Sequence, residues 1–288
     1  MTEVIYVASP GWGHMLSTSL HTLIRSGTSF DSVRIFCVGS RPSSWTFTDE
    51  RVHVVEVPPL DANYFLLNKT YAVQSEADRV IFLDADTLVL RPLDDTWQRT
   101  DADVIGRIET EFNRRWKHDT WQHVLGRVGA PSTTPYFNSG FFILQNGSHK
   151  RIGRRWEVYG RAGMKGTLFN PLTLGHIDAR FAEQVAFSLA LGAAGLTYDF
   201  LSSRDHAYGW AFEPHQEATV YHTGGPGYFH YAALLESPHN LRLSSPVVVS
   251  ATSPLFLRTQ YHLMVGRLKM ALKRVLNGWA LHRRRLPD

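Results

Sequence analysis

The sequence predicts an α/β protein with a mostly parallel, Rossmann-like sheet flanked by helices, and three observations favour this class. Short apolar runs rich in β-branched residues alternate with longer segments of helical periodicity, as in parallel strands joined by crossover helices. Acidic and other polar residues collect where the apolar runs end, which is where such sheets bind ligands. The 288 residues, 43% of them hydrophobic, are enough to bury a sizeable core.

Each strand is predicted from an apolar run, and each helix from apolar residues three or four positions apart. The first four strands are predicted over residues 4–8, 33–38, 52–57 and 80–83, and later strands over residues 103–108 and 136–144. Helices are predicted over residues 17–25, 64–75, 116–126, 150–160 and 179–191.

Asp84 and Asp86 directly follow the apolar strand of residues 80–83. Because successive strand side chains point to opposite faces, the two carboxylates share a face as long as the backbone stays extended. Carboxylate oxygens are the ligands that Mg²⁺ and Mn²⁺ prefer. The alternative is a solvated strand end whose carboxylates cap the next turn. Asp84 and Asp86 are therefore candidate ligands of a metal ion.

The loop after the first strand contains Ser9 and Trp12, and Trp12 has one glycine on each side. Its glycines would let the backbone approach a nucleotide while Trp12 stacks on the base. A tight turn with Trp12 packed on the surface explains the same residues, because glycine and proline mark turns whatever their function.

Three further segments place polar residues beside apolar runs. Asn138, Ser139 and Gly140 interrupt an apolar strand, either because a ligand approaches closely or because they form a bulge in which the asparagine caps the backbone. Glu183 and Gln184 begin an apolar helix, where an acid is favoured by the helix dipole in any case. His222 ends a short strand before a glycine-rich loop, where an imidazole would complete a metal shell.

Five segments, and their order along the chain, closely resemble the glycogenin-like retaining glycosyltransferases (glycosyltransferase family 8). This family has the A-type fold and an Asp-x-Asp motif. The matching segments are Asn68-Lys69-Thr70, the strand leading to Asp84-Ala85-Asp86, Phe137-Asn138-Ser139-Gly140, Glu183-Gln184 and Val220-Tyr221-His222.

The resemblance implies a hexosyltransferase that moves a sugar from a UDP-linked donor to a hydroxyl acceptor with retention. It implies Mn²⁺ or Mg²⁺ held by Asp84, Asp86 and His222, and catalytic work by Glu183 or Gln184, with Asp178 as a further candidate. The expected donor-binding residues are Ala8, Ser9, Trp12, Asn68, Lys69, Asp84, Ala85, Asp86, Asn138, Ser139, Gly140, Gly224 and Gly225. On the acceptor side we expect only a subset of seven aromatic residues to line an open cleft beside Asn138 and Glu183, with core packing as the alternative for most of them: Trp116, Trp121, Tyr136, Trp210, Phe212, Tyr228 and Tyr231.

The sequence departs from the family pattern at two places. Glu183 stands where the family usually has aspartate, which lengthens the reach of the carboxylate by one methylene. The lysine that follows the family's late histidine, and grips the donor phosphates there, is missing. Phosphate contact must then come from backbone amides of residues 224–227, from Arg107 or Arg204, or mainly from the metal.

The last 31 residues differ in composition from the rest. Residues 258–288 carry eight Lys or Arg and one acid, or +7, so the preceding residues sum to −3 of the total of +4. Apolar residues recur there at helical spacing, which predicts a basic amphipathic helix. This helix either docks on the catalytic domain or attaches peripherally to an anionic membrane; nucleic acid is not expected, since no recognition motif accompanies the charge.

We therefore expect a catalytic domain over residues 1–257, with a nucleotide-sugar half over about 1–110 and an acceptor half over about 111–257. The single cysteine, Cys37, fits a reducing compartment, and no run is long and apolar enough to cross a bilayer, so a cytoplasmic protein is expected. The alternatives are a nucleotidyltransferase that forms sugar nucleotides, a non-catalytic sugar-nucleotide-binding protein, and a metal-free two-lobed glycosyltransferase, which the chain is too short to form.

Overall fold

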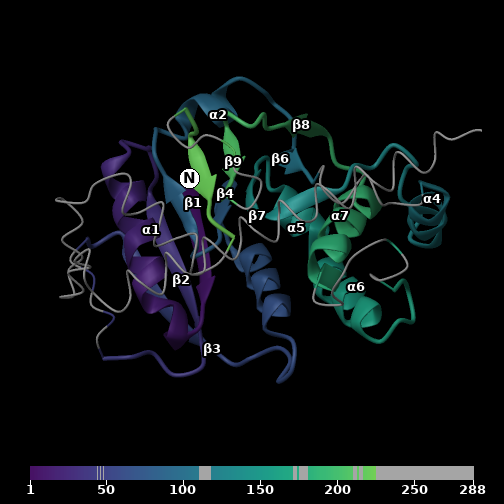
Figure 1. The fold of residues 1–288 in the computed structure, drawn as a ribbon, viewed down its shortest axis with the longest axis horizontal. Coiled ribbons are helices and arrows are strands. Elements are labelled where there is room, and N and C mark those ends of the chain that lie inside the picture. Colours follow the sequence, from purple (N-terminus) through teal and green to yellow (C-terminus); the bar gives the residue numbers. More distant parts are fainter. Residues whose placement is uncertain are drawn as a thin grey trace, which may run out of the picture.

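The computed structural model describes residues 1–43, 45, 47, 49–109, 118–170, 174, 181–209, 213 and 217–224. Its centre is a seven-stranded sheet in the order β3-β2-β1-β4-β7-β6-β8 (Figure 1). The strands are β1 (Thr2–Ala8), β2 (Ser32–Val38), β3 (Val52–Val57), β4 (Arg79–Leu83), β6 (Val104–Ile108), β7 (Phe137–Leu144) and β8 (Tyr198–Phe200). Neighbouring strands pair in parallel except that β7 is antiparallel to both β4 and β6. The predicted α/β class with a mostly parallel sheet is confirmed.

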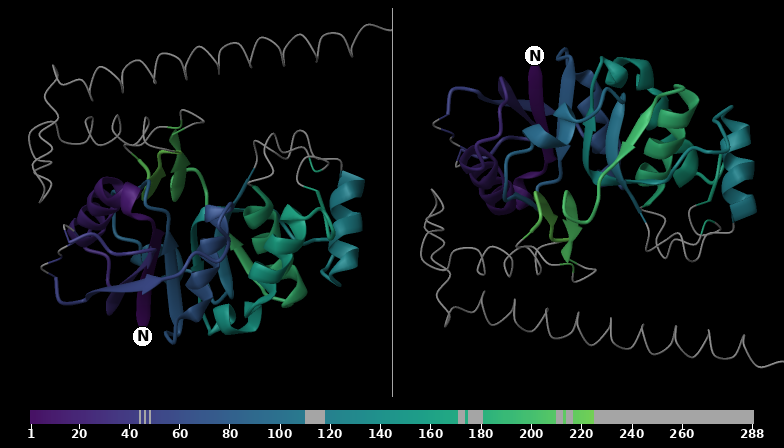
Figure 2. Two further views of the ribbon diagram at one scale, coloured as in Figure 1. Left: turned by 90° about the horizontal axis from the view of Figure 1, so that it is seen from below. Right: turned by 90° about the horizontal axis from the view of Figure 1, so that it is seen from above.

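A second, three-stranded sheet consists of β5 (Thr87–Val89), β10 (Val220–His222) and β9 (His206–Tyr208), in that order. It lies at the end of the main sheet opposite the N-terminus (Figure 2). Strand β5 begins four residues after β4 ends, so the small sheet lies next to the carboxyl end of a central strand of the main sheet. This is the edge at which ligands bind in α/β proteins.

Helices cover both faces of the main sheet. They are α1 (Gly13–Arg25), α2 (Asp94–Gln98), α4 (His118–Arg127), α5 (Ser148–Ile152), α6 (Arg155–Met164) and α7 (Ala182–Ala193), with 3₁₀ helices η1 (Pro10–Trp12) and η2 (Phe65–Gln74). Alternate residues of β1 separate two cores: Val4 and Tyr6 join the cluster that contains α1, whereas Ile5 and Val7 join the cluster that contains η2 and α7. This alternation follows from the two-residue period of a strand.

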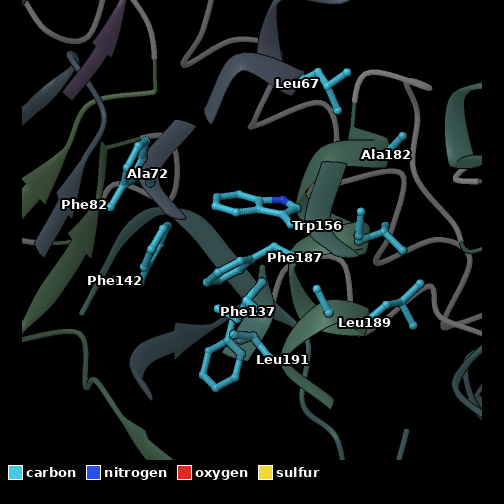
Figure 3. Packing of buried hydrophobic residues seen from close by; sticks show 14 of the residues in the cluster. Leu67, Ala72, Phe82, Phe137, Phe142, Trp156, Ala182, Phe187, Leu189 and Leu191 are labelled. Carbon is cyan, nitrogen blue, oxygen red and sulfur yellow. The ribbon is translucent and has the colours of Figure 1, made fainter. Parts of the chain in front are cut away.

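Aromatic packing fixes the start of α7, which is important for the site. Phe187 on α7 lies 4.4 Å from the ring of Phe142 on β7 and 4.7 Å from that of Trp156 on α6, between ring centroids (Figure 3). All three residues are fully buried, and the indole Nε1 of Trp156 donates to the carbonyl of Glu183 at 3.0 Å. The first turn of α7 is thus attached to the core and to β7.

Two predicted helices differ in detail from the structure. Residues 65–74 form a 3₁₀ helix. The sequence predicts only that they are helical, because apolar spacing does not distinguish a period of 3.0 residues from one of 3.6. The single helix predicted over residues 150–160 is two helices, since Gly153 adopts a left-handed φ of +52° between α5 and α6.

No helix of the described residues is long and apolar enough to cross a membrane. The predicted tail helix of residues 258–288 lies outside the part of the chain that the structure describes.

Candidate active site

Asp84, Asp86 and His222 converge at the carboxyl edge of the main sheet. The Nε2 atom of His222 lies 3.2 Å from Oδ1 of Asp86 and 3.7 Å from Oδ2 of Asp84. One ligand atom from each residue lies within 4.8 Å of the other two. Two carboxylate oxygens and an imidazole can together hold a divalent metal ion, so these residues fit the metal site that the sequence predicts.

The two aspartates meet through a turn, not through an extended strand as we expected. Strand β4 ends at Leu83, and the backbone amide of Thr87 donates to the carbonyl of Asp84 at 3.1 Å. The hydroxyl of Thr87 donates to the same carbonyl at 2.7 Å. Residues 84–86 therefore form a tight bend, and the pairing of Thr87 with His222 brings the histidine to it.

Gly140 leaves the space that His222 occupies. A Cβ atom built on Gly140 would lie 2.0 Å from Cε1 of His222 and 3.0 Å from Oδ2 of Asp84. The backbone amide of Asp84 donates to the carbonyl of Gly140 at 2.8 Å, so β7 also holds the start of the acidic bend. A glycine is required here because any side chain would enter the cluster.

Lys69 forms an ion pair with the acidic bend. Its Nζ lies 2.7 Å from Oδ2 of Asp84, with side chains 12% and 17% exposed. Burial alone would lower the pKa of Lys69, but the charges of Asp84, Glu183 and Asp86 outweigh burial and raise it. Lys69 is thus an ammonium that neutralises part of the acidic cluster.

The two carboxylates of the bend differ in acidity. Burial raises the pKa of Asp84 even though Lys69 lies beside it. Burial also opposes ionisation of Asp86, but the charge of His222 and its hydrogen bond outweigh burial and hold the pKa of Asp86 below its usual value. The more acidic Asp86 is therefore the carboxylate that keeps its charge most readily.

Glu183 lies behind the bend with one carboxylate oxygen unused. Its Oε2 accepts from the hydroxyl of Ser139 at 3.0 Å, whereas Oε1 is buried and has no hydrogen-bond partner in the described part of the chain. Burial raises the pKa of Glu183 to about 7. An unsatisfied buried carboxylate oxygen is costly, which is a common property of groups that await a ligand.

Gln184, by contrast, uses both its amide oxygen and its amide nitrogen in hydrogen bonds within the protein. Its Oε1 accepts from the backbone amide of Ser139 at 3.1 Å, and its Nε2 donates to the hydroxyl of Tyr136 at 2.6 Å. The amide braces the Ser139 segment of β7 against α7. Of the two expected catalytic residues, Glu183 therefore has the available atom.

Asn68 and Asn138, which we expected to bind the donor, form side-chain hydrogen bonds within the protein. The side chain of Asn138 accepts from the amide of Gly140 at 2.9 Å and donates to Glu109 at 3.0 Å, which corresponds to the alternative of a backbone-capping asparagine. The side chain of Asn68 accepts from the amide of Leu60 and donates to the carbonyl of Phe65. Both amides are thus used to shape the site.

Glu109 is a buried acid that the sequence interpretation missed. It directly follows β6 and is 1% exposed. The feature that would have indicated it is the one that indicated Asp84, an acid directly after an apolar strand.

The first loop forms η1 and leads into α1. Ser9 precedes this turn, accepting from the amide of Trp12 at 3.0 Å, and Ala8 is buried at the end of β1. The partly buried indole of Trp12 packs against two of the hydrophobic clusters. Trp12 thus packs against the protein, as the alternative interpretation expects, and its stacking on a nucleotide base stays a prediction.

Two basic side chains considered for the donor phosphates are ion-paired. Arg107 makes two bonds of 2.6 Å to Glu213, and the exposed Arg204 lies 3.3 Å from Glu217. Gly224 ends the described part of the loop, with φ of +74°. Asp178, Gly225 and five of the acceptor-side aromatic residues lie outside the described residues; the other two, Trp121 and Tyr136, are buried.

The acidic bend and the histidine lie at the carboxyl edge of a mostly parallel sheet, which agrees with the A-type glycosyltransferase fold that the sequence resemblance implies. Residues 45–195 match the model of the Rhodobacterales glycosyltransferase domain. This match covers more than half of the chain, and the chain belongs to that family. No curated protein matches the sequence.

Solved structures agree on the fold. The galactosyltransferase LgtC in complex with donor and acceptor sugar analogs is 14% identical, with a TM-score of 0.56 over 85% of this chain and 92% of that chain. An active-site mutant of LgtC gives a TM-score of 0.57 at 14% identity over 82% and 95%. The bifunctional glycosyltransferase WbbM in its apo form gives 0.53 at 11% identity over 78% of this chain and 46% of that chain.

Proposed function

We propose that this protein is a metal-dependent hexosyltransferase of the glycogenin-like family 8 type, which transfers a sugar from a UDP-linked donor to a hydroxyl acceptor with retention. The observation that carries the proposal is the convergence of Asp84, Asp86 and His222 within reach of one ion, in front of a buried Glu183 with an unused oxygen. The sequence resemblance supports it, as does the fold shared with LgtC, which was solved with donor and acceptor sugar analogs.

Asp84, Asp86 and His222 would hold the divalent ion. When bound, Mn²⁺ or Mg²⁺ offsets the charge that develops on the departing diphosphate, as a Lewis acid does. Lys69 adds a positive charge at the same edge and approaches the nucleotide end of the donor. Because Arg107 is paired with Glu213 and Arg204 with Glu217, we propose that the phosphate contacts would come from the metal and from backbone amides of residues 224–227.

The sugar would lie over Glu183 and Ser139. The free Oε1 of Glu183 accepts a sugar hydroxyl or, when ionised, stabilises the positive charge that develops at the anomeric carbon. Ser139 holds the other oxygen and so fixes the carboxylate plane. Gln184 and Tyr136 keep the Ser139 segment in place behind the sugar.

The basic tail is proposed to make a peripheral contact with an anionic membrane, with docking on the chain's own domain as the competing role. The cytoplasmic location is likewise a proposal, supported by the presence of a single, buried cysteine.

The decisive experiment measures release of nucleoside diphosphate and sugar from a panel of UDP-, GDP- and dTDP-sugars, with and without Mn²⁺ or Mg²⁺. We expect turnover of a UDP-hexose that stops in excess chelator, and an NMR analysis of the product that shows a retained anomeric configuration. Turnover in excess chelator would contradict the metal site. Formation of a sugar nucleotide from a sugar phosphate would identify a nucleotidyltransferase, and donor binding without turnover under any condition would identify a binding protein.

A further inference from the structure

The imidazole of His206 lies directly beside the proposed metal ligand His222 and makes no hydrogen bond to the described residues. It is 0% exposed on β9, and neither of its ring nitrogens has a hydrogen-bond partner within the described residues. A buried polar group without a partner lowers stability, so an imidazole retained in this position calls for an explanation.

The ring faces of His206 make the contacts that its nitrogens do not. Its ring is stacked on the ring of His222, with centroids 5.7 Å apart and planes 9° from parallel. The rings of Phe141 and Tyr208 meet it edge-on, at 5.3 Å and 4.9 Å between centroids. His206 is thus held between aromatic edges and presents a flat surface to His222.

The register of the small sheet explains this arrangement. β9 and β10 pair in parallel, with Val220 opposite His206 and His222 opposite Tyr208. Side chains at these four positions share one face of the sheet, because residues two apart on a strand point to the same side. The two histidines are therefore diagonal neighbours on the face that points to the acidic bend.

The backbone of β9 is also held firmly to the main sheet. Arg107 of β6 donates to the carbonyl of His206 and makes two bonds to Glu213. Glu213 in turn accepts from the backbone amide of Tyr208 at 2.7 Å. An ion pair thus connects β6 to both ends of the short strand that carries His206.

We infer that His206 is a positioning residue that uses its ring face to hold the imidazole plane of His222, so that Nε2 of His222 faces Asp84 and Asp86. Rotation of the His222 ring about its Cβ–Cγ bond would carry Nε2 away from Asp86. The ring of His206 resists this rotation, and the backbone of Gly140 lies close to Cε1 of the same ring. Groups that orient metal-binding histidines usually act through a hydrogen bond; here ring stacking has that role.

This inference rests on the metal site proposed above, and it is tested by three variants of the full chain. His206→Phe keeps a ring and removes both nitrogens, His206→Asn keeps a polar nitrogen and removes the ring, and His206→Ala removes both. His149→Ala is the matched control, because His149 is another fully buried histidine, located on α5 and bonded to the carbonyl of Ser75. Mn²⁺ affinity is measured by calorimetry, and thermal unfolding is followed for every variant.

We expect His206→Ala and His206→Asn to weaken Mn²⁺ binding on the order of tenfold, the lower end of the usual effect of removing a group that orients a metal ligand. His206→Phe should restore most of the lost affinity, and His149→Ala should lower the melting temperature without changing the affinity. If His206→Asn keeps wild-type affinity and His206→Phe does not, the nitrogens are the working atoms and the inference is wrong.

A metal-free measurement separates this inference from the metal proposal. In ¹⁵N-labelled protein without metal, the ring nitrogens of His222 should give one set of resonances in wild type and His206→Phe. In His206→Ala and His206→Asn they should be broadened or multiple, because the ring is free to rotate. Identical His222 resonances in all variants would overturn the inference. Absence of Mn²⁺ binding to the wild type would overturn the proposed metal site and would leave the NMR comparison to decide on the role of His206.

Discussion

Gly140 and His222 are so close that no side chain fits between them: a Cβ atom on Gly140 would lie 2.0 Å from Cε1 of the imidazole. These residues are 82 positions apart in sequence and lie in different sheets. The imidazole of His222 fits here only because residue 140 has no side chain. Gly140 forms part of β7, and His222 ends β10.

Substitution of Gly140 by alanine should therefore displace His222 from the acidic bend. We expect Gly140→Ala to weaken Mn²⁺ binding at least on the order of tenfold, as for other changes that misplace a ligand, with most of the secondary structure retained. Calorimetry gives the affinity and circular dichroism the fold. Gly126→Ala on α4 is the matched control, since a Cβ there meets nothing within 4 Å; equal affinity in the two variants would contradict the close approach.

Removal of the most acidic ligand should abolish metal-dependent turnover. Asp86 keeps its charge because His222 faces it, so Asp86→Asn removes a full negative charge from the site. We expect no measurable Mn²⁺ binding and no release of nucleoside diphosphate, with the secondary structure retained in circular dichroism. The melting temperature without metal should fall, because a carboxylate whose pKa is lowered in the folded protein stabilises it when ionised. Asp101→Asn, a change at an exposed acid outside the site, is the control. Normal turnover by Asp86→Asn would exclude this aspartate as a ligand.

The stability of the protein should depend on pH through Glu183. Because its pKa is raised from 4.5 to about 7, its contribution to stability is fully present below pH 4.5 and is lost as the pH rises through about 7. Glu183→Gln cannot ionise, so its melting temperature should exceed that of wild type increasingly between pH 5 and pH 8. The difference in unfolding free energy corresponds to on the order of 3 kcal/mol at most.

The same variant should lose activity, which separates stability from function. Glu183→Gln removes the charge proposed to face the anomeric carbon, so turnover should fall even where the variant is the more stable protein. Thermal unfolding across the pH range and turnover at pH 8 provide the two measurements. A stability difference that is independent of pH would show that Glu183 does not titrate in this range.

Lys69→Met should make the protein depend on metal for stability. The substitution leaves the buried carboxylate of Asp84 without its cation, which costs about 3 kcal/mol in comparable buried pairs. Mn²⁺ can take the place of the missing charge, so it should raise the melting temperature of Lys69→Met more than that of wild type. Lys150→Met, which breaks only the exposed pair with Glu76, should show no such difference. Equal metal-induced shifts in all three proteins would contradict the role of Lys69 beside Asp84.

The tail proposal predicts salt-sensitive binding to acidic lipid. Full-length protein should co-sediment with vesicles containing anionic phospholipid at low salt and dissociate as the salt concentration rises, since each clustered basic residue adds about 1 kcal/mol near such a surface. Replacing Arg283, Arg284 and Arg285 by glutamine should weaken this binding and leave donor turnover unchanged. Equal vesicle binding by the triple variant would exclude these three arginines from the contact.

The sequence by itself determined the strands, the fold class and the positions of the metal-binding candidates. Residues 4–8, 33–38 and 80–83 were predicted as strands and are strands, because their apolar, β-branched runs are local patterns that a buried parallel sheet requires. Asp84 and Asp86 could be identified because an acid that ends an apolar strand stands out within a few residues.

Only the tertiary structure decided how these residues meet and which of them have free atoms. Asp84 and Asp86 converge through a bend that depends on pairing with β10, and Lys69 reaches Asp84 across 15 residues. Hydrogen-bond partners that the sequence does not reveal occupy the side-chain amides of Asn68, Asn138 and Gln184. Among the described residues, Oε1 of Glu183 is by contrast without a partner. Local patterns report burial and backbone shape, whereas hydrogen-bond partners far apart in sequence are set by the packing of whole elements. For that reason the stacking of His206 on His222 appears only in the folded chain.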